Sequence, residues 1–103
     1  MGILERIYER TATAGAEPIA CTLTPVLGYD QITPRILELN GQIIDYCKRH
    51  GIPLVELFAS TSDGHNRLRE DYSDDGVHLN SSGYRMVAKA IGEVILKLLS
   101  DKI

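Results

Sequence analysis

The sequence predicts an α/β fold in which helices alternate with parallel strands. Two short apolar runs, at residues 17–24 and 52–58, have the length and composition of buried strands. Three longer segments repeat their apolar residues at the spacing of an amphipathic helix. Along the chain the order is helix, strand, helix, strand, long loop, helix, which is typical of parallel strands joined by right-handed crossovers.

The first helix and the first strand are predicted over residues 3–14 and 17–24. Gly15 is placed to end the helix. The run 19–21 does not alternate between apolar and polar residues, which favours a strand covered on both faces, and Pro25 stops it. The apolar residues expected to share one face of this helix are Ile3, Leu4, Ile7, Tyr8 and Ala14.

The second helix and the second strand follow a short loop. Pro34 suits the first turn of a helix, because its missing N–H would be unpaired there anyway, and Gly51 ends the helix after His50. The strand is expected over residues 52–58, and Pro53 near its start indicates an edge strand. The stripe of this helix is expected at Ile36, Leu39, Asn40, Ile43 and Cys47.

The last third of the chain contains a long polar segment and a final helix. Residues 59–76 have no clear periodicity, and a loop this long on a small domain is often functional. The helix begins near Asn80 or Ser81 as N-cap. Its buried stripe is expected at Tyr84, Val87, Ala88, Ile91, Ile95 and Leu98. A sheet of two strands is poorly stable by itself, so we expect the rest of a larger sheet to be missing.

Composition excludes several classes of function. A chain of 103 residues forms one domain at most. The net charge of -3 and the lack of a basic face argue against a nucleic-acid partner. No apolar run reaches the roughly 18–20 residues that span a membrane. Residues 1–6 lack the apolar core of a secretion signal, so a cytoplasmic protein is expected if Met1 is the natural start.

Cys21 and Cys47 are the only cysteines. Neither lies in a Cys-x-x-Cys pair or in another spacing typical of metal ligands. Free cysteine is among the residues most often buried, so we expect two buried thiols. A disulfide or a reactive thiol is the alternative.

The pair Asp75 and His78 carries the clearest chemical signal. A carboxylate three residues before a histidine on a turn can hold one ring nitrogen while the other faces a substrate as general base. Gly76 between them allows backbone angles that other residues resist. The alternative interpretation is a helix start with an acidic cap and a surface histidine.

The string Asp-Gly-Val-His-Leu-Asn at 75–80, followed by Gly83 and Tyr84 and an amphipathic helix, closely resembles the last motif of the SGNH (GDSL-type) serine esterases and lipases. Residues 20–25 resemble the fourth strand of that family, and residues 51–58 resemble its fifth. The resemblance implies the C-terminal part of a flavodoxin-like, three-layer α/β/α fold, with about two parallel strands and three helices.

The resemblance also implies an activity: hydrolysis of an ester by Ser-His-Asp chemistry without a cofactor. His78 would be the general base and Asp75 its orienting carboxylate. The chain contains neither the family's Gly-Asp-Ser nucleophile segment nor its Gly-x-Asn-Asp segment. We therefore expect residues 1–103 to form a single incomplete domain that is inactive alone, because triad members act as a unit.

No local serine is expected to replace the missing nucleophile. The serines near the pair lie on no Gly-x-Ser-x-Gly or Gly-Asp-Ser turn, so we interpret them as loop and capping residues. These serines are Ser60, Ser62, Ser73, Ser81 and Ser82. A metal site built from Asp75, His78 and His65 has no recognisable ligand spacing, and no metal is expected.

Two functions remain open on the sequence alone. The chain is either the C-terminal part of an SGNH-type ester hydrolase or a non-catalytic structural or binding module derived from one. In the five-stranded parallel sheet that the resemblance implies, the strand at 17–24 pairs with a third strand that this chain lacks. Its edge would then be open in both cases, and an open apolar edge recruits another strand. We therefore expect a homodimer, or another association, through this strand.

Overall fold

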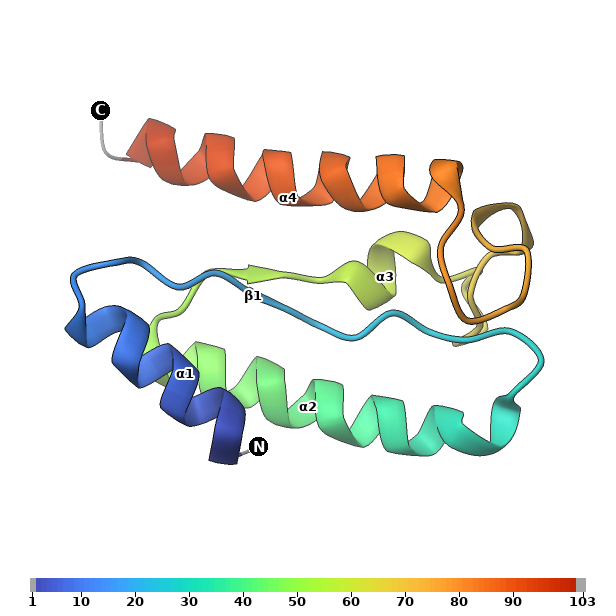
Figure 1. Cartoon of the computed structure of the whole chain (residues 1–103), viewed down its shortest axis with the longest axis horizontal. Coiled ribbons are helices and arrows are strands. Elements are labelled where there is room, and N and C mark those ends of the chain that lie inside the picture. The colour runs from blue at the N-terminus through green and yellow to red at the C-terminus, as the bar shows by residue number, and fades with distance from the viewer. Residues whose placement is uncertain (1, 102–103) are drawn as a thin grey trace.

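The computed structural model describes residues 2–101 and has three layers (Figure 1). The described elements are α1 (Gly2–Thr13), β1 (Ala20–Cys21), α2 (Thr33–His50), β2 (Leu54–Val55), α3 (Leu57–Thr61) and α4 (Ser81–Asp101), with 3-10 turns at Asp30–Ile32 and Glu70–Tyr72. The strands lie in the middle, with α4 on one side and α1 and α2 on the other. β1 and β2 are parallel, with Ala20 opposite Leu54. The predicted α/β class is confirmed.

The core lies between the strands and α2. Ala20, Ile43 and Cys47 form a buried cluster, and Tyr8, Ile52 and Leu54 pack against it. Gly51 ends α2 as predicted: its φ of 64° is left-handed, and its N–H donates to the carbonyl of Cys47. Both thiols are free, and burial raises the pKa of each. Cys47 is buried as expected, whereas Cys21 is only half-buried.

β1 is much shorter than the strand expected over 17–24, because Asn40 takes over the hydrogen bonding of Leu23. The N–H of Leu23 donates to Oδ1 of Asn40 at 2.7 Å, and Nδ2 of Asn40 donates to the carbonyl of Leu23 at 3.1 Å. Asn40 is 5% exposed, so this amide is a buried part of the fold. The edge of the strand is therefore closed at Leu23.

The second predicted strand is wrong beyond Val55, because residues 57–61 form α3. The N–H of Phe58 donates to the buried hydroxyl of Thr22 at 3.0 Å, which fixes the first turn of this helix beside β1. Apolar residues at 57 and 58 suit either conformation, so the sequence pattern did not separate them. The described residues therefore contain a fourth helix that the sequence did not predict.

The long segment after α3 is ordered by tertiary contacts. Leu68 is fully buried, and its N–H donates to the carbonyl of Val26 at 3.2 Å. The guanidinium of Arg67 makes two hydrogen bonds to the carboxylate of Asp30, at 2.8 and 3.0 Å. These contacts hold the segment at the end of the sheet where β1 leads into residues 26–30.

The apolar faces of α1 and α4 are less covered than expected. Ile3 is 75% exposed, and Tyr84 is 62% exposed. Further exposed apolar residues on these two helices are Leu4, Ile7, Ile95, Leu96 and Leu99. Of the stripe expected on α4, Val87, Ile91 and Leu98 are half-buried, whereas Tyr84, Ala88 and Ile95 are exposed. The other covered residues of this helix are Gly83, which is buried, and the half-buried Met86, Ala90, Gly92 and Val94. Across residues 2–101, no helix is both long and apolar enough to cross a membrane.

Candidate active site at the Asp75–His78 turn

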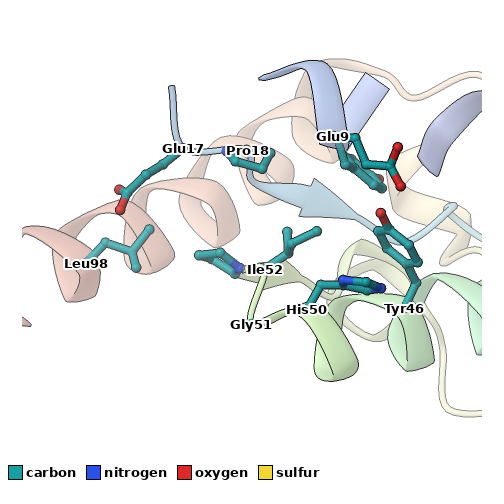
Figure 2. Close-up of a pocket in the computed structure, with 10 residues that line it drawn as sticks. Glu9, Glu17, Pro18, Tyr46, His50, Gly51, Ile52 and Leu98 are labelled. Carbon is teal, nitrogen blue, oxygen red and sulfur yellow. The ribbon is translucent and has the colours of Figure 1, made fainter. Parts of the chain in front are cut away.

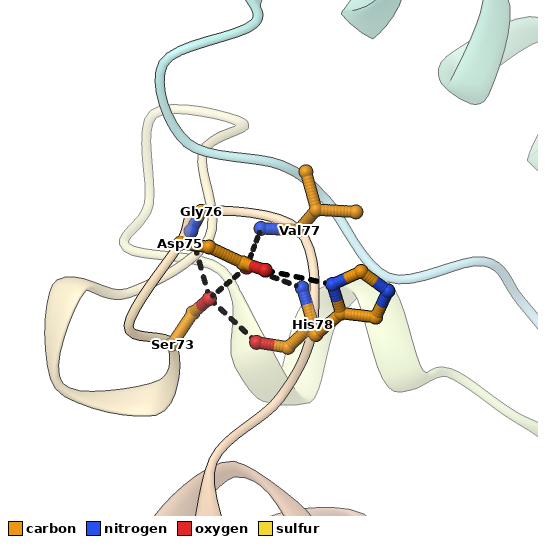
Figure 3. Close-up of polar contacts among 5 residues, drawn as sticks. All are labelled: Ser73, Asp75, Gly76, Val77 and His78. Atoms are coloured by element: carbon orange, nitrogen blue, oxygen red, sulfur yellow. Dashed lines mark hydrogen bonds and ion pairs between the residues drawn. The ribbon is translucent and has the colours of Figure 1, made fainter.

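The carboxylate of Asp75 holds both the backbone and the imidazole of its turn (Figure 3). Oδ1 accepts the N–H groups of Val77 and His78, each at 2.8 Å. Oδ2 lies 2.7 Å from Nδ1 of His78. One oxygen therefore shapes the turn while the other orients the ring. The structure thus brings together the two residues that the sequence singled out.

The electrostatics of the pair favour an ionised carboxylate. The hydrogen bond to the His78 ring, followed by the bonds from the backbone N–H groups of Val77 and His78, holds the pKa of Asp75 far below its ordinary value. A carboxylate at Nδ1 favours the tautomer with its proton on that nitrogen and leaves Nε2 as an acceptor. The side chain of His78 is 83% exposed. An imidazole held in this way can accept a proton at Nε2.

Gly76 is required by the path of the backbone. Its φ is +84°, and an added Cβ would collide with the backbone carbonyl of Leu27. The N–H of Leu27 donates to the carbonyl of Gly76 at 2.8 Å. This contact attaches the turn to the segment that follows β1.

Asn80 and Gly83 attach α4 to the same turn. Oδ1 of Asn80 accepts the N–H of Gly83 at 3.0 Å, as expected of an N-cap. The backbone N–H of Asn80 donates to the carbonyl of Tyr72 at 2.9 Å. A Cβ on Gly83 would lie 2.6 Å from that same carbonyl oxygen, so only glycine fits. The packing role of Gly83 was not visible in the sequence.

Ser73 was interpreted from sequence as a loop or capping residue, but it is 8% exposed and lies inside the turn. Its hydroxyl bonds to Gly76 and to His78. The other candidate serines have local roles or lie at the surface: Ser60 donates to the carbonyl of Glu56, Ser62 accepts the N–H of Gly64, and Ser81 and Ser82 are exposed. Within residues 2–101, no serine hydroxyl is hydrogen-bonded to the imidazole of His78.

His65 belongs to a different turn, in which its N–H donates to Oδ1 of Asp63 at 2.7 Å. Among the described residues, no three His, Cys, Asp or Glu side chains form a group that could hold a metal ion. Within the described residues, His65 therefore does not join Asp75 and His78 in a group that could bind a metal ion.

A cavity of about 380 Å³ lies at the opposite end of the strands (Figure 2). Its lining includes Pro18 and Ile52, which precede β1 and β2, together with Tyr46 and His50 of α2 and Leu98 of α4. Neither Asp75 nor His78 contributes to it. This cavity is consequently separate from the candidate active site.

Comparison with known proteins decides the family. The model of the GDSL-like lipase/acylhydrolase family matches residues 2–86. The chain belongs to this family. The resemblance of the Asp75–His78 block to the GDSL-type hydrolases is thereby confirmed at the level of the family. Among curated proteins, none matches the chain.

Two crystal structures are similar to this GDSL-family chain. One is a protein assigned as an acylhydrolase from Bacteroides fragilis, with 27% sequence identity and a TM-score of 0.85 over 95% of this chain and 50% of the other. The second is a GDSL-like lipase from Bacteroides thetaiotaomicron, with 23% identity and a TM-score of 0.83 over 94% of this chain and 51% of the other. The second supports the fold alone. The GDSL chain spans about half the length of both proteins.

Proposed function

We propose that this chain supplies the general base and its orienting carboxylate to a GDSL-type ester hydrolase. The observation that carries the proposal is the 2.7 Å contact between Oδ2 of Asp75 and Nδ1 of His78, beside a largely exposed ring. Membership of the GDSL-like lipase/acylhydrolase family supports an ester or another acyl compound as substrate.

In the proposed reaction, Nε2 of His78 takes the proton from a serine hydroxyl as that oxygen attacks the ester carbonyl. The imidazolium then gives the proton to the departing alcohol, and water releases the acyl group from the serine. Asp75 keeps Nδ1 protonated and stabilises the imidazolium throughout. No cofactor takes part.

The serine and the oxyanion donors are proposed to come from polypeptide outside these 103 residues. The chain has no Gly-Asp-Ser and no Gly-x-Asn-Asp segment. It also covers only about half of the similar acylhydrolase structure. Residues 1–103 are accordingly proposed to be one incomplete domain, inactive by itself because a base without a nucleophile cannot form the acyl intermediate.

The edge of β1 that faces away from β2 is proposed to be where the chain associates, with a second copy as the simplest partner. Within the described residues, β1 pairs only with β2. The N–H groups of Ala20 and Thr22 donate toward β2. Because backbone groups alternate in direction along a strand, the N–H and carbonyl of Cys21 face the other edge. The exposed apolar residues of α1 and α4 add apolar surface that association would bury.

A chimera tests the proposed function. Residues 2–101 replace the structurally matched half of the Bacteroides fragilis protein, and the parent is first shown to react with a fluorophosphonate probe and to hydrolyse p-nitrophenyl acetate. We expect the folded chimera to do both, and His78→Ala to reduce both by about three orders of magnitude. A chimera that melts cooperatively but shows neither reaction would favour the non-catalytic module. Labelling of the 103-residue chain alone would contradict the proposed origin of the serine.

A further inference from the structure

The hydroxyl of Ser73 lies inside the Asp75–His78 turn, where it contacts the backbone of Gly76 and of His78 (Figure 3). It accepts the N–H of Gly76 at 2.9 Å and donates to the carbonyl of His78 at 2.6 Å. It also lies 3.3 Å from Oδ1 of Asp75. A hydroxyl has one proton, and the shorter contact identifies the His78 carbonyl as its acceptor.

We propose that Ser73 is a positioning residue that holds the imidazole of His78 against Asp75; this inference rests on the proposed function of the turn. The backbone of His78 is held at both of its polar groups. Its N–H donates to Asp75, and its carbonyl accepts from Ser73. With the backbone fixed, only the two side-chain torsions of His78 remain to be ordered, and the bond from Nδ1 to Asp75 orders them.

The surrounding backbone places the Ser73 hydroxyl within hydrogen-bonding distance of Gly76 and His78. Ser73 is extended, with φ of -152° and ψ of 143°, and pairs with Leu79 in an antiparallel bridge. One residue further out, Tyr72 accepts the N–H of Asn80. The two ends of the turn are thereby fixed to each other, and the buried hydroxyl spans the loop between them. Alanine would leave the Gly76 N–H and the His78 carbonyl without this partner.

The ring tautomer of His78 measures how well the imidazole is held against Asp75, and this measurement does not require a nucleophile. At pH 9, where an imidazole is neutral, ¹⁵N chemical shifts of the labelled chain separate the Nδ1–H form from the Nε2–H form. We expect the Nδ1–H form to dominate in the unmodified protein. Ser73→Ala should lower its ratio to the Nε2–H form by roughly five-fold, the equivalent of one ordinary hydrogen bond. Ser73→Thr, which retains the hydroxyl, should restore the ratio.

Ser60→Ala is the matched control, because it also deletes one hydroxyl-to-carbonyl hydrogen bond, from Ser60 in α3 to the N-cap residue Glu56. It should leave the His78 tautomer unchanged. If Ser73→Ala lowers the melting temperature but keeps the unmodified tautomer ratio, Ser73 is merely structural and the proposal is wrong. If Ser73→Thr loses the Nδ1–H form as fully as alanine does, the hydroxyl is not the cause.

Should Ser73→Ala not fold, amide exchange in the unmodified chain gives a separate test. The Gly76 N–H should exchange at least about ten-fold more slowly than in the unfolded chain, because Ser73 accepts its proton. Exchange at the unfolded rate would overturn the proposal. None of these outcomes depends on catalysis, so a chimera without activity would refute the proposed function and leave the positioning by Ser73 to be judged separately.

Discussion

The side-chain amide of Asn40 takes the place of a neighbouring strand beside Leu23, accepting from its N–H and donating to its carbonyl. A helix thus supplies the hydrogen bonds that a sheet would otherwise supply, at the point where β1 leads toward the Asp75–His78 turn. Asparagine suits this position because its amide carries a donor and an acceptor side by side.

Asn40→Ala should therefore destabilise the fold by about 1–3 kcal/mol, since both backbone groups of Leu23 would lose their partner in a half-buried place. Urea denaturation followed by circular dichroism measures the change. Gln42→Ala, which removes an exposed amide from the same helix, is the control and should change stability by less than about 0.5 kcal/mol. Equal effects of the two variants would contradict the bridging role of Asn40.

Gly76→Ala should cost more than an ordinary glycine substitution at positive φ. Gly28 has a similar φ of +88° but open space around it, whereas a Cβ on Gly76 meets the carbonyl of Leu27. Gly28→Ala should therefore lose about 1–2 kcal/mol from backbone strain alone. Gly76→Ala should lose a further ~1–3 kcal/mol from the collision. The comparison uses the same denaturation assay, and a smaller loss at Gly76 than at Gly28 would argue against the tight turn.

The stability of the chain should fall in acid partly through Asp75. Its pKa is lowered by folding, so the folded state binds fewer protons than the unfolded state. The stabilisation is fully present above the unfolded pKa of about 4 and is lost as the pH falls through the lower folded pKa. The difference in unfolding free energy between the unmodified chain and Asp75→Asn should shrink between pH 6 and pH 2. Asp74→Asn is the neighbouring control, and a difference independent of pH would count against this assignment.

Association through β1 can be tested by light scattering after size-exclusion chromatography. At micromolar concentration we expect twice the chain mass of 11.4 kDa. Cys21→Pro removes the backbone N–H that faces the unpaired edge of β1. A strand from a second copy could then no longer accept a hydrogen bond from this position, so the variant should give the monomer mass. A monomer already present in the unmodified chain would rule out the homodimer.

The sequence predicted the features that depend on local signals. Gly51 ended α2 as expected of a C-cap glycine, and the spacing of Asp75 and His78 brought the two side chains together. The helix of residues 57–61 was missed because its first turn is fixed by the hydroxyl of Thr22, a contact between positions 36 residues apart. Such a tertiary bond leaves no periodic trace in the sequence.

The remaining errors share a physical cause. The sequence patterns of α1 and α4 indicate apolar faces, but a pattern does not say how much of a face the chain itself can cover, and Ile3 and Tyr84 stay exposed. Ser73 was interpreted only as a loop or capping residue, because a serine in a polar loop resembles any capping residue. Its role depends on burial and on the bridge to Leu79, which only the folded backbone provides.

The turn that carries Asp75 and His78 is almost self-contained: its ordering contacts come from residues 72–80, with Leu27 as an anchor. A turn held by such local contacts does not need the nucleophile segment in order to form. A well-formed aspartate–histidine pair is therefore evidence of family membership rather than of turnover, and a genome search for this motif alone would also return chains that, like this one, have no Gly-Asp-Ser segment.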